Sequence, residues 1–259
     1  MTSANNSDLV PNRILAALPD KEYQRLLPHL KQIELRQGEI LYAPGDVIEY
    51  VYFPGSGIIS LVTLLKDGAS VEVGVVGREG MCGISIVLGD NRAPSQAIVQ
   101  IGNGAVRLKA DILGEELKRG GELRNLLQRF ILVCLQRSSQ AAACNRNHHV
   151  GERLAFWLLT CQDSIGHNHL KLTQDFIAEM LGTRRAGVSE AAMTLQSLGL
   201  IKYRRGNINI MDREGLEEFS CECYRAVRQE FDRLFNAAQI PDPAPNPHPK
   251  NGFQNDPHP

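Results

Sequence analysis

The most regular hydrophobic pattern of the chain lies between residues 172 and 201. Apolar residues recur there at steps of three and four in two blocks, which predicts two short amphipathic helices. The apolar positions are Phe176, Ile177, Met180 and Leu181, then Val188, Ala191, Ala192, Leu195 and Leu198. Gly182 separates the blocks and can adopt the left-handed backbone that ends a helix. Thr173 and Thr183 stand where each helix should begin, so both are predicted N-caps.

The second predicted helix has a far face of different character. That face carries Ala186, Ser189, Glu190 and Met193, and Arg184 and Arg185 precede it. Recognition helices enter the DNA major groove with their N-terminal residues, and a helix with one buried face and short side chains opposite suits that use. The alternative is an ordinary helical hairpin with a solvated face.

The residues that follow favour DNA. Residues 200–210 predict two short strands around Arg204, Arg205, Gly206 and Asn207, a hairpin with a basic tip. A helix-turn-helix followed by such a hairpin is a winged helix. Residues 183–206 carry five basic residues and one acidic residue, a net charge of +4, whereas the whole chain carries −1. Local positive charge of this kind is what phosphate binding needs.

Upstream, the pattern changes to short β-rich runs. Twelve glycines fall between Gly38 and Gly104, and Asp67-Gly68 predicts a hairpin turn. Many short strands with regular turn signals predict a sandwich, jelly roll or barrel. The predicted strands are Ile40–Tyr42, Tyr50–Phe53, Ile58–Leu65, Ser70–Val76, Ala97–Ile101 and Ala105–Leu108.

Between the β-rich part and the winged helix, apolar residues recur at steps of four and three over about three heptads. The seam positions are Leu123, Leu127, Phe130, Cys134, Arg137, Ala141 and Cys144, of which Arg137 alone is charged and counts against perfect pairing. This seam predicts a long helix, and it favours a parallel coiled-coil dimer over a helix packed on its own domain.

Three further helical stretches complete the prediction. Residues 11–35 form a helical lead-in, residues 150–160 an amphipathic helix with Trp157 in the core, and residues 216–235 a single last helix. We therefore expect an α+β chain with a loose N-terminus (1–11), a β-roll or jelly-roll sensor (12–120), a dimerisation helix (121–146), a winged helix-turn-helix domain (147–235) and a disordered tail (236–259).

Length and composition agree with this organisation. The 259 residues suit two domains, and 43% hydrophobic with 22% charged residues allow a sizeable core. No apolar run approaches the roughly 18 residues of a membrane span, and the N-terminus lacks the layout of a signal peptide. We expect a cytoplasmic protein with no membrane partner.

Residues for catalysis or cofactor binding are not evident, so we expect no enzyme. Only His29 stands before residue 148 among the histidines, and no phosphate-binding loop or catalytic triad pattern occurs. The six cysteines are expected to be thiols in a reducing compartment. Cys221 and Cys223, two apart on a predicted helix, should face different sides, and the His148-His149 pair should be solvated. No metal or cofactor is expected.

A β-roll, a long dimerising helix and a C-terminal winged helix together resemble the Crp/Fnr family of bacterial transcription regulators. The resemblance covers roughly Asn12 to Phe235 and is strongest over residues 172–210; residues 46, 51–52 and 55–59 also look like the opening strands of the roll. It implies a homodimer on a two-fold symmetric double-stranded DNA site, a small-molecule signal sensed by the roll, and RNA polymerase as a further partner.

Within the resemblance, Arg185 matches the arginine that reads a guanine edge in members responding to cyclic AMP. Ser189 matches a serine of the oxygen-responsive members, while Ala186 and Glu190 replace the usual glutamate and arginine. The target sequence should therefore differ from both known sites. The predicted DNA-binding residues are Thr173, Thr183, Arg184, Arg185, Ser189, Glu190, Arg204 and Arg205.

The sensing residues depart further from the family pattern. Nucleotide-binding members have a glutamate after a glycine, where Ile84 stands here, and an arginine with a hydroxyl residue where Ser95 and Gln96 stand. No cysteine precedes Cys82 to hold the iron–sulfur cluster of the oxygen sensors. The effector is therefore unknown. The competing functional class is a ligand-binding module whose winged helix docks protein instead of DNA.

Overall fold

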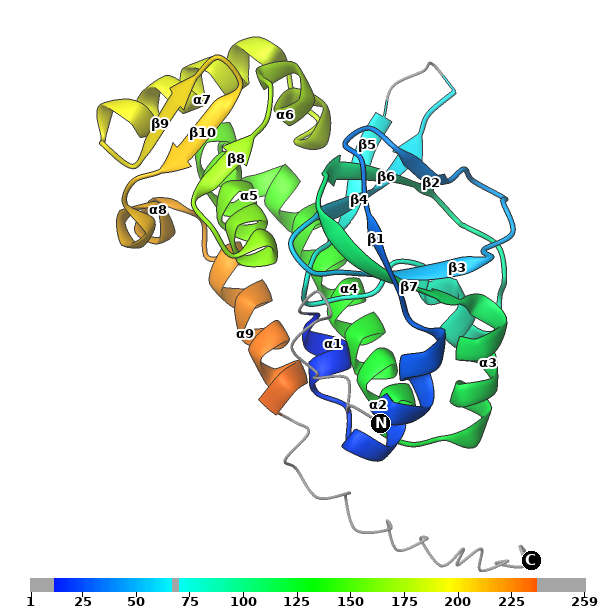
Figure 1. Ribbon diagram of the computed structural model, residues 1–259. Helices are drawn as coiled ribbons and strands as arrows, with labels where there is room; N and C mark the ends of the chain where they lie inside the picture. Colours follow the sequence, from blue (N-terminus) through cyan, green and yellow to red (C-terminus); the bar gives the residue numbers. More distant parts are fainter. Residues whose placement is uncertain (1–11, 67–69, 237–259) are drawn as a thin grey trace, which may run out of the picture.

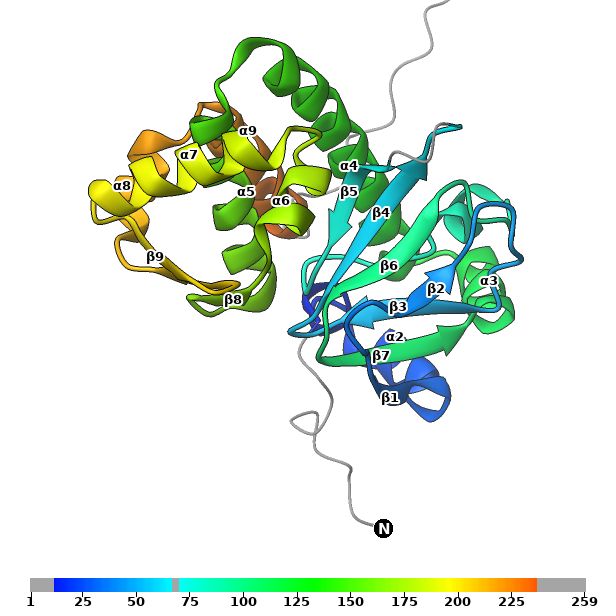
Figure 2. The same cartoon turned by 90° about the horizontal axis from the view of Figure 1, so that it is seen from above.

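The computed structural model describes residues 12–66 and 70–236, which form two lobes joined by one long helix (Figures 1 and 2). The expectations for residues 1–11, for the Asp67-Gly68 turn and for the tail from residue 237 lie outside the described residues. None of the helices in the described part of the chain is long and apolar enough to cross a lipid bilayer.

The N-terminal lobe is a β-roll of two antiparallel sheets. One sheet has the order β1-β7-β3 and the other β2-β6-β4-β5. The strands are β1 (Lys31–Glu34), β2 (Ile40–Tyr42), β3 (Tyr50–Pro54), β4 (Ile58–Leu64), β5 (Ser70–Val76), β6 (Gln96–Ile101) and β7 (Gly104–Lys109). Six of the seven were predicted, with bounds within one residue. β1 was missed because its only apolar residue is Ile33.

Short helices close the roll on one side. They are α1 (Arg13–Ala16), α2 (Asp20–Leu26), the 3-10 turns η1 (Leu27–His29) and η2 (Ile84–Leu88), and α3 (Ala110–Arg119). Buried Asn12 caps α1 and also donates from Nδ2 to the carbonyls of Pro54 and Gly80, both at 2.9 Å. Because both the oxygen and the nitrogen of this buried side-chain amide are hydrogen-bonded, Asn12 holds the start of α1 against the roll. The predicted helical lead-in is correct only as far as His29, because Lys31–Glu34 form β1.

The long helix α4 (Glu122–Asn147) packs its predicted seam inside its own chain. Leu123, Leu127 and Phe130 are at most 1% exposed, because they lie against the roll and against the last helix, α9 (Cys223–Asn236). Figure 1 shows α9 running along α4. Five of the seven seam residues are buried within the chain, and Cys134 and Ala141 are half-buried. The expectation that this seam is a dimer interface is therefore wrong.

The C-terminal lobe is a winged helix-turn-helix. Its elements are α5 (Val150–Ile165), β8 (His169–Lys171), α6 (Gln174–Met180), α7 (Arg185–Ser197), β9 (Ile201–Arg204), β10 (Asn207–Ile210) and α8 (Arg213–Phe219). The wing sheet has the order β8-β10-β9. β8 was not predicted, because its three residues carry a single apolar side chain, Leu170.

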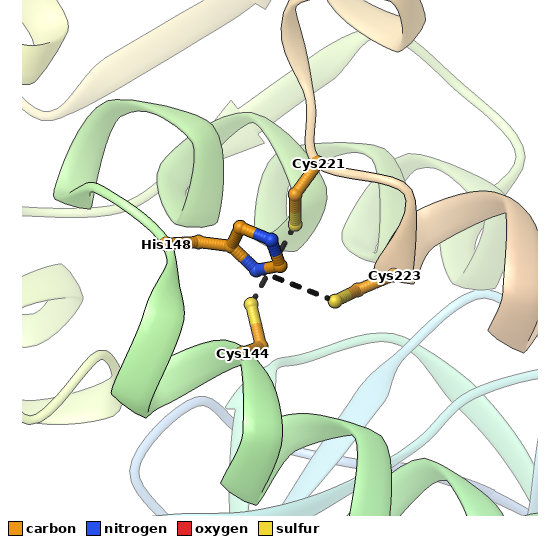
Figure 3. Close-up of side chains that lie close together, drawn as sticks. All are labelled: Cys144, His148, Cys221 and Cys223. Carbon is orange, nitrogen blue, oxygen red and sulfur yellow. Dashed lines mark hydrogen bonds between the residues drawn. The ribbon is translucent and has the colours of Figure 1, made fainter.

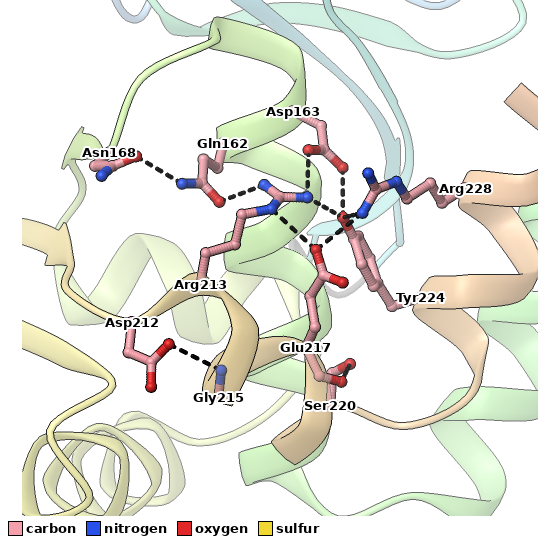
Figure 4. Close-up of polar contacts among 10 residues, drawn as sticks. All are labelled: Gln162, Asp163, Asn168, Asp212, Arg213, Gly215, Glu217, Ser220, Tyr224 and Arg228. Atoms are coloured by element: carbon pink, nitrogen blue, oxygen red, sulfur yellow. Dashed lines mark hydrogen bonds and ion pairs between the residues drawn. The ribbon is translucent and has the colours of Figure 1, made fainter. Parts of the chain in front are cut away.

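The predicted single last helix is wrong: it is two helices, α8 and α9, separated at residues 220–222. A polar network joins them to α5 (Figure 4). Arg213 pairs with Asp163 at 2.9 Å and with Glu217 at 2.9 Å, and the Tyr224 hydroxyl donates to Asp163 at 2.8 Å. Burial raises the pKa of Tyr224 above its usual value.

The same break corrects two expectations about cysteine and histidine. Cys221 precedes α9 and Cys223 is its first residue, so they do not sit on opposite faces of one helix. His148 is not solvated but half-buried, with Nδ1 3.5 Å from the Cys223 sulfur. His149 is exposed, as expected, and its backbone N–H donates to Glu152 at 2.8 Å.

Candidate nucleic-acid interface

The first helix of the motif, α6, begins as predicted. The Thr173 hydroxyl accepts a hydrogen bond from the Phe176 N–H at 3.2 Å, and Asp175 lies in the first turn, where the helix dipole favours a negative charge. Gly182 has φ +58°, the left-handed conformation expected beyond the helix end. These features set the tight turn that orients the next helix.

The second helix, α7, starts later than predicted. Arg184 is its N-cap residue and no side chain caps it, so the expectation that Thr183 caps α7 is wrong. Thr183 belongs to the turn instead, with its N–H donating to the Ala178 carbonyl at 2.9 Å. Val188 and Leu195 are fully buried on the inner face, which leaves the outer face free.

The wing has the predicted basic tip. Arg204 pairs with Asn207 in the ladder, and the two central residues, Arg205 and Gly206, both have positive φ (+48° and +76°), as in a type I′ turn. The Tyr203 hydroxyl donates to the Leu172 carbonyl at 3.1 Å. This bond links the wing to the residue that precedes the cap of α6, and so helps to fix the position of the wing relative to the helices.

A groove of about 400 Å³ lies between the start of α6, the outer face of α7 and the wing. Arg185 lies in it and pairs through Nε with Asp175 at 3.4 Å, both side chains being about two-thirds exposed. An exposed pair of this kind is weakly held, so Arg185 can exchange its carboxylate partner for a base edge. The Ser189 hydroxyl donates to Gln174 Oε1 at 2.9 Å.

Four of the eight predicted residues line this groove: Thr173, Arg185, Ser189 and Arg205. The other four, Thr183, Arg184, Glu190 and Arg204, lie outside its lining. Thr183 and Ser189 are half-buried, and the other six are exposed.

Sequence reasoning missed Gln174, Gln196 and Tyr203 as groove residues. Gln196 Oε1 accepts the Tyr203 N–H at 2.8 Å, which joins the end of α7 to the wing. The helical phase of α7 places residue 196 on the same side as Ser189 and Met193, so this residue could have been found. Gln174 requires knowledge of how the two helices cross.

The surface around the groove is basic. The exposed cationic side chains are Lys171, Arg184, Arg185, Lys202, Arg204 and Arg205. Asp175, Glu179 and Glu190 are the exposed acids among residues 171–206. The excess of positive charge suits a polyanion.

Two family models match the chain. The Crp-like helix-turn-helix domain matches residues 152–219 and the cyclic nucleotide-binding domain matches residues 32–115. Together they cover more than half of the chain. The first coincides with the lobe that carries the groove, and the second with the β-roll.

Named relatives and solved structures match most of the chain. The global nitrogen regulator of Nostoc sp. is 23% identical over 184 residues, which are 67% of this chain and 82% of that protein. The structure of FixK2 from Bradyrhizobium japonicum has a TM-score of 0.64 at 18% identity, covering 74% of this chain and 98% of the other. A putative Crp/Fnr regulator from Eubacterium rectale has a TM-score of 0.60 at 20% identity, covering 80% and 96%.

The β-roll, the long helix and the winged helix with its basic groove define a transcription regulator with a helix-turn-helix DNA-binding domain. The chain belongs to the Crp/Fnr family, as the two matching domains in this order indicate.

Proposed function

We propose that the protein is a homodimeric, sequence-specific regulator whose two α7 helices enter major grooves about one helical turn apart on a pseudo-palindromic site. The observation that carries this is the groove in which Arg185 and Ser189 of α7 face the basic wing. In this proposal residues 12–120 form the sensor, 121–146 the dimerisation helix and 147–235 the DNA-binding domain.

Each predicted DNA-binding residue has an assigned role in this proposal. Arg185, at the start of α7, reads a guanine edge through its two-donor fork, the commonest specific contact in the major groove. Ser189 and Glu190 lie one turn further on and select neighbouring bases. Arg184, Arg204 and Arg205 contact phosphates, as exposed arginines on a turn and a wing can do without base specificity.

The two threonines contribute through the backbone that they order. The Thr173 hydroxyl is already engaged as the cap of α6. In this proposal the start of α6 therefore contacts DNA through main-chain N–H groups and not through this hydroxyl. Thr183 holds the turn before α7, and this places Arg185 in the groove and Arg184 next to it in the chain.

The dimer uses the outward face of α4, not the buried seam. Leu132 and Leu135 are 48% and 62% exposed, and Ser139 and Ala142 continue the same stripe at steps of four and three. A heptad stripe of this kind, apolar at one end and small at the other, suits close packing of two parallel helices. Its position on the long helix would hold the two DNA-binding lobes side by side.

The effector is a molecule other than cyclic AMP or cyclic GMP, and we assign no cofactor. Ile84 and Ser95 offer neither the acceptor nor the cation that a cyclic nucleotide needs. RNA polymerase is a further partner in this proposal, through which the bound dimer would act on transcription.

The experiment that tests the proposal is selection of binding sites from random duplex DNA by the full-length protein. The expected product is a two-fold symmetric sequence, bound by a dimer, with affinity that falls steeply as salt rises because several phosphates are contacted. A selected site without two-fold symmetry, or a protein that stays monomeric on DNA, would contradict the dimer. No preference for any duplex would favour a winged helix that docks protein.

A further inference from the structure

Three cysteines and a histidine meet between the two lobes. Cys144 and His148 lie one turn apart at the end of α4, and Cys221 and Cys223 flank the start of α9 (Figure 3). Their four potential ligand atoms all lie within 4.8 Å of one another. The three sulfurs are buried and His148 is half-buried. The set joins chain segments 77 residues apart.

The spacing of these atoms fits one tetrahedral ion. The Cys144 and Cys221 sulfurs are 3.6 Å apart, and the Cys223 sulfur is 3.5 Å from His148 Nδ1. Tetrahedral bonds of about 2.3 Å to sulfur and 2.0–2.1 Å to nitrogen give edges of about 3.8 Å and 3.5 Å. A polynuclear iron–sulfur cluster distributes its four protein ligands over two or more iron atoms and therefore needs a more widely spaced ligand set.

The surroundings orient the ligands as in a metal site. His148 points Nδ1 at the sulfurs, and its other ring nitrogen, Nε2, is 3.3 Å from the Glu222 carboxylate. A carboxylate on the second ring nitrogen is the arrangement that fixes a metal-bound histidine. Gln140 donates from Nε2 to the Cys223 sulfur at 3.0 Å, a bond that suits a thiolate. If the three thiols only packed against one another, the contacts of Glu222 and Gln140 would not be needed.

We propose that Cys144, His148, Cys221 and Cys223 bind one Zn²⁺ ion in a closed structural site that fastens the start of α9 to the end of α4. Three thiolates and one imidazole are a common structural zinc set, and four protein ligands leave no open position for catalysis. Binding displaces the thiol protons and leaves the ion divalent, so no redox step is involved.

The position of the site gives it a consequence for the fold. α4 ends at Asn147 and α5 begins at Val150, so the ion would lie at the junction through which the DNA-binding lobe joins the long helix. Removing it should loosen that junction. An effect on DNA affinity would rest on the proposed function, whereas metal content and cobalt spectra do not depend on DNA.

The test is metal analysis of the full-length protein, purified under reducing conditions with zinc supplied. About one zinc per chain is expected, and Co²⁺ should replace it with the visible absorption of a tetrahedral thiolate site. Cys221→Ser and Cys223→Ser should lose the zinc, whereas Cys134→Ser, which changes a cysteine outside the cluster, should keep it. Glu222→Gln should weaken zinc affinity about 10–100-fold.

Several results would overturn the proposal. Reduced protein that takes up neither Zn²⁺ nor Co²⁺ would show that the thiols only pack. A Cys144–Cys221 disulfide in protein purified anaerobically, or iron with acid-labile sulfide in place of zinc, would contradict it equally. The cobalt titration uses the unmodified chain, so this test stands even where a serine variant does not fold.

Discussion

The indole Nε1 of Trp157 donates a hydrogen bond to Glu72 Oε1 at 3.1 Å, and this bond links the DNA-binding lobe to the β-roll. Trp157 lies on α5 and Glu72 on β5. The other carboxylate oxygen of Glu72 accepts from the Ser60 hydroxyl at 2.7 Å. Figure 2 shows β4 and β5 beside α5 and α6, so the contact belongs to a wider junction between the lobes.

Burial raises the pKa of the Glu72 carboxyl to about 7, although the bonds from Ser60 and Trp157 and the charge of Arg137 lower it. The pKa of Glu72 is therefore higher in the folded than in the unfolded protein. The contribution of the protonated carboxyl to the stability of the fold is complete below about pH 4.5 and is lost as the pH rises to about 7. The carboxylate should therefore cost stability of the order of 1–3 kcal/mol at pH 8.

We expect Glu72→Gln to be more stable than the unmodified chain at pH 8 and to lose this part of the pH dependence. The amide oxygen can still accept from Trp157, so the junction is retained. Denaturant unfolding between pH 5 and 8 measures the effect, with the fluorescence of the sole tryptophan as the probe. Parallel pH curves for the two proteins would show that Glu72 does not titrate in this range.

Local signals explain why most of the fold could be predicted. The roll strands have dense apolar residues between turn residues, and α6 and α7 have helical spacing with a glycine between them. β1 and β8 were missed because each carries a single apolar residue, Ile33 and Leu170. Their places are set by pairing with β7 and β10, which local sequence does not encode.

Only part of the candidate site, too, could be predicted from local sequence. The outer face of α7 and the basic wing follow from helical phase and turn residues, so Arg185 and Arg205 could be predicted. The partner of the α4 seam could not, because the period of three and four residues is the same whether α9 or a second chain covers it. The meeting of Cys144 with Cys221 depends on the break after α8, a tertiary feature.

Arg185 and Arg204 should separate base reading from phosphate contact. Arg185→Ala is expected to cost about 1–3 kcal/mol on the selected site and to relax preference at one base pair, because a two-donor base contact is lost. Arg204→Ala should weaken specific and random duplexes alike and lower the salt slope by about one. Fluorescence anisotropy titrations on both duplexes, at several salt concentrations, measure this. Equal losses on both duplexes for Arg185→Ala would contradict its assigned role.

Leu135 should be needed for dimerisation. It is 62% exposed in the single chain, and Leu135→Glu would place an unpaired charge in the proposed apolar interface. A cost of about 3 kcal/mol corresponds to a dimer that dissociates about 100-fold more readily. Sedimentation equilibrium measures this. Gln136→Glu adds the same charge at the next exposed position and should leave the dimer intact; equal effects would place the interface elsewhere.

Cyclic AMP and cyclic GMP should not act as effectors. A cyclic phosphate stays charged when buried and needs a cation with several donors, but Ser95 and Gln96 supply none. Ile84 cannot accept from the ribose hydroxyl. Arg92 is the nearest cation in sequence, and it lies at the surface, where Nη1 donates to the Gly45 carbonyl at 2.8 Å.

Two unpaired polar contacts, each costing about 1–3 kcal/mol, should move a micromolar affinity towards the millimolar range. Titration calorimetry with both nucleotides checks this. A variant that restores both groups, Ile84→Glu with Ser95→Arg, should bind more tightly than the unmodified chain and so shows whether the roll is otherwise competent. A dissociation constant for the unmodified chain tighter than about 100 μM, together with improved DNA binding, would contradict the argument. It would mean that Arg92 leaves Gly45 to hold the phosphate, because no other cation lies between residues 79 and 106.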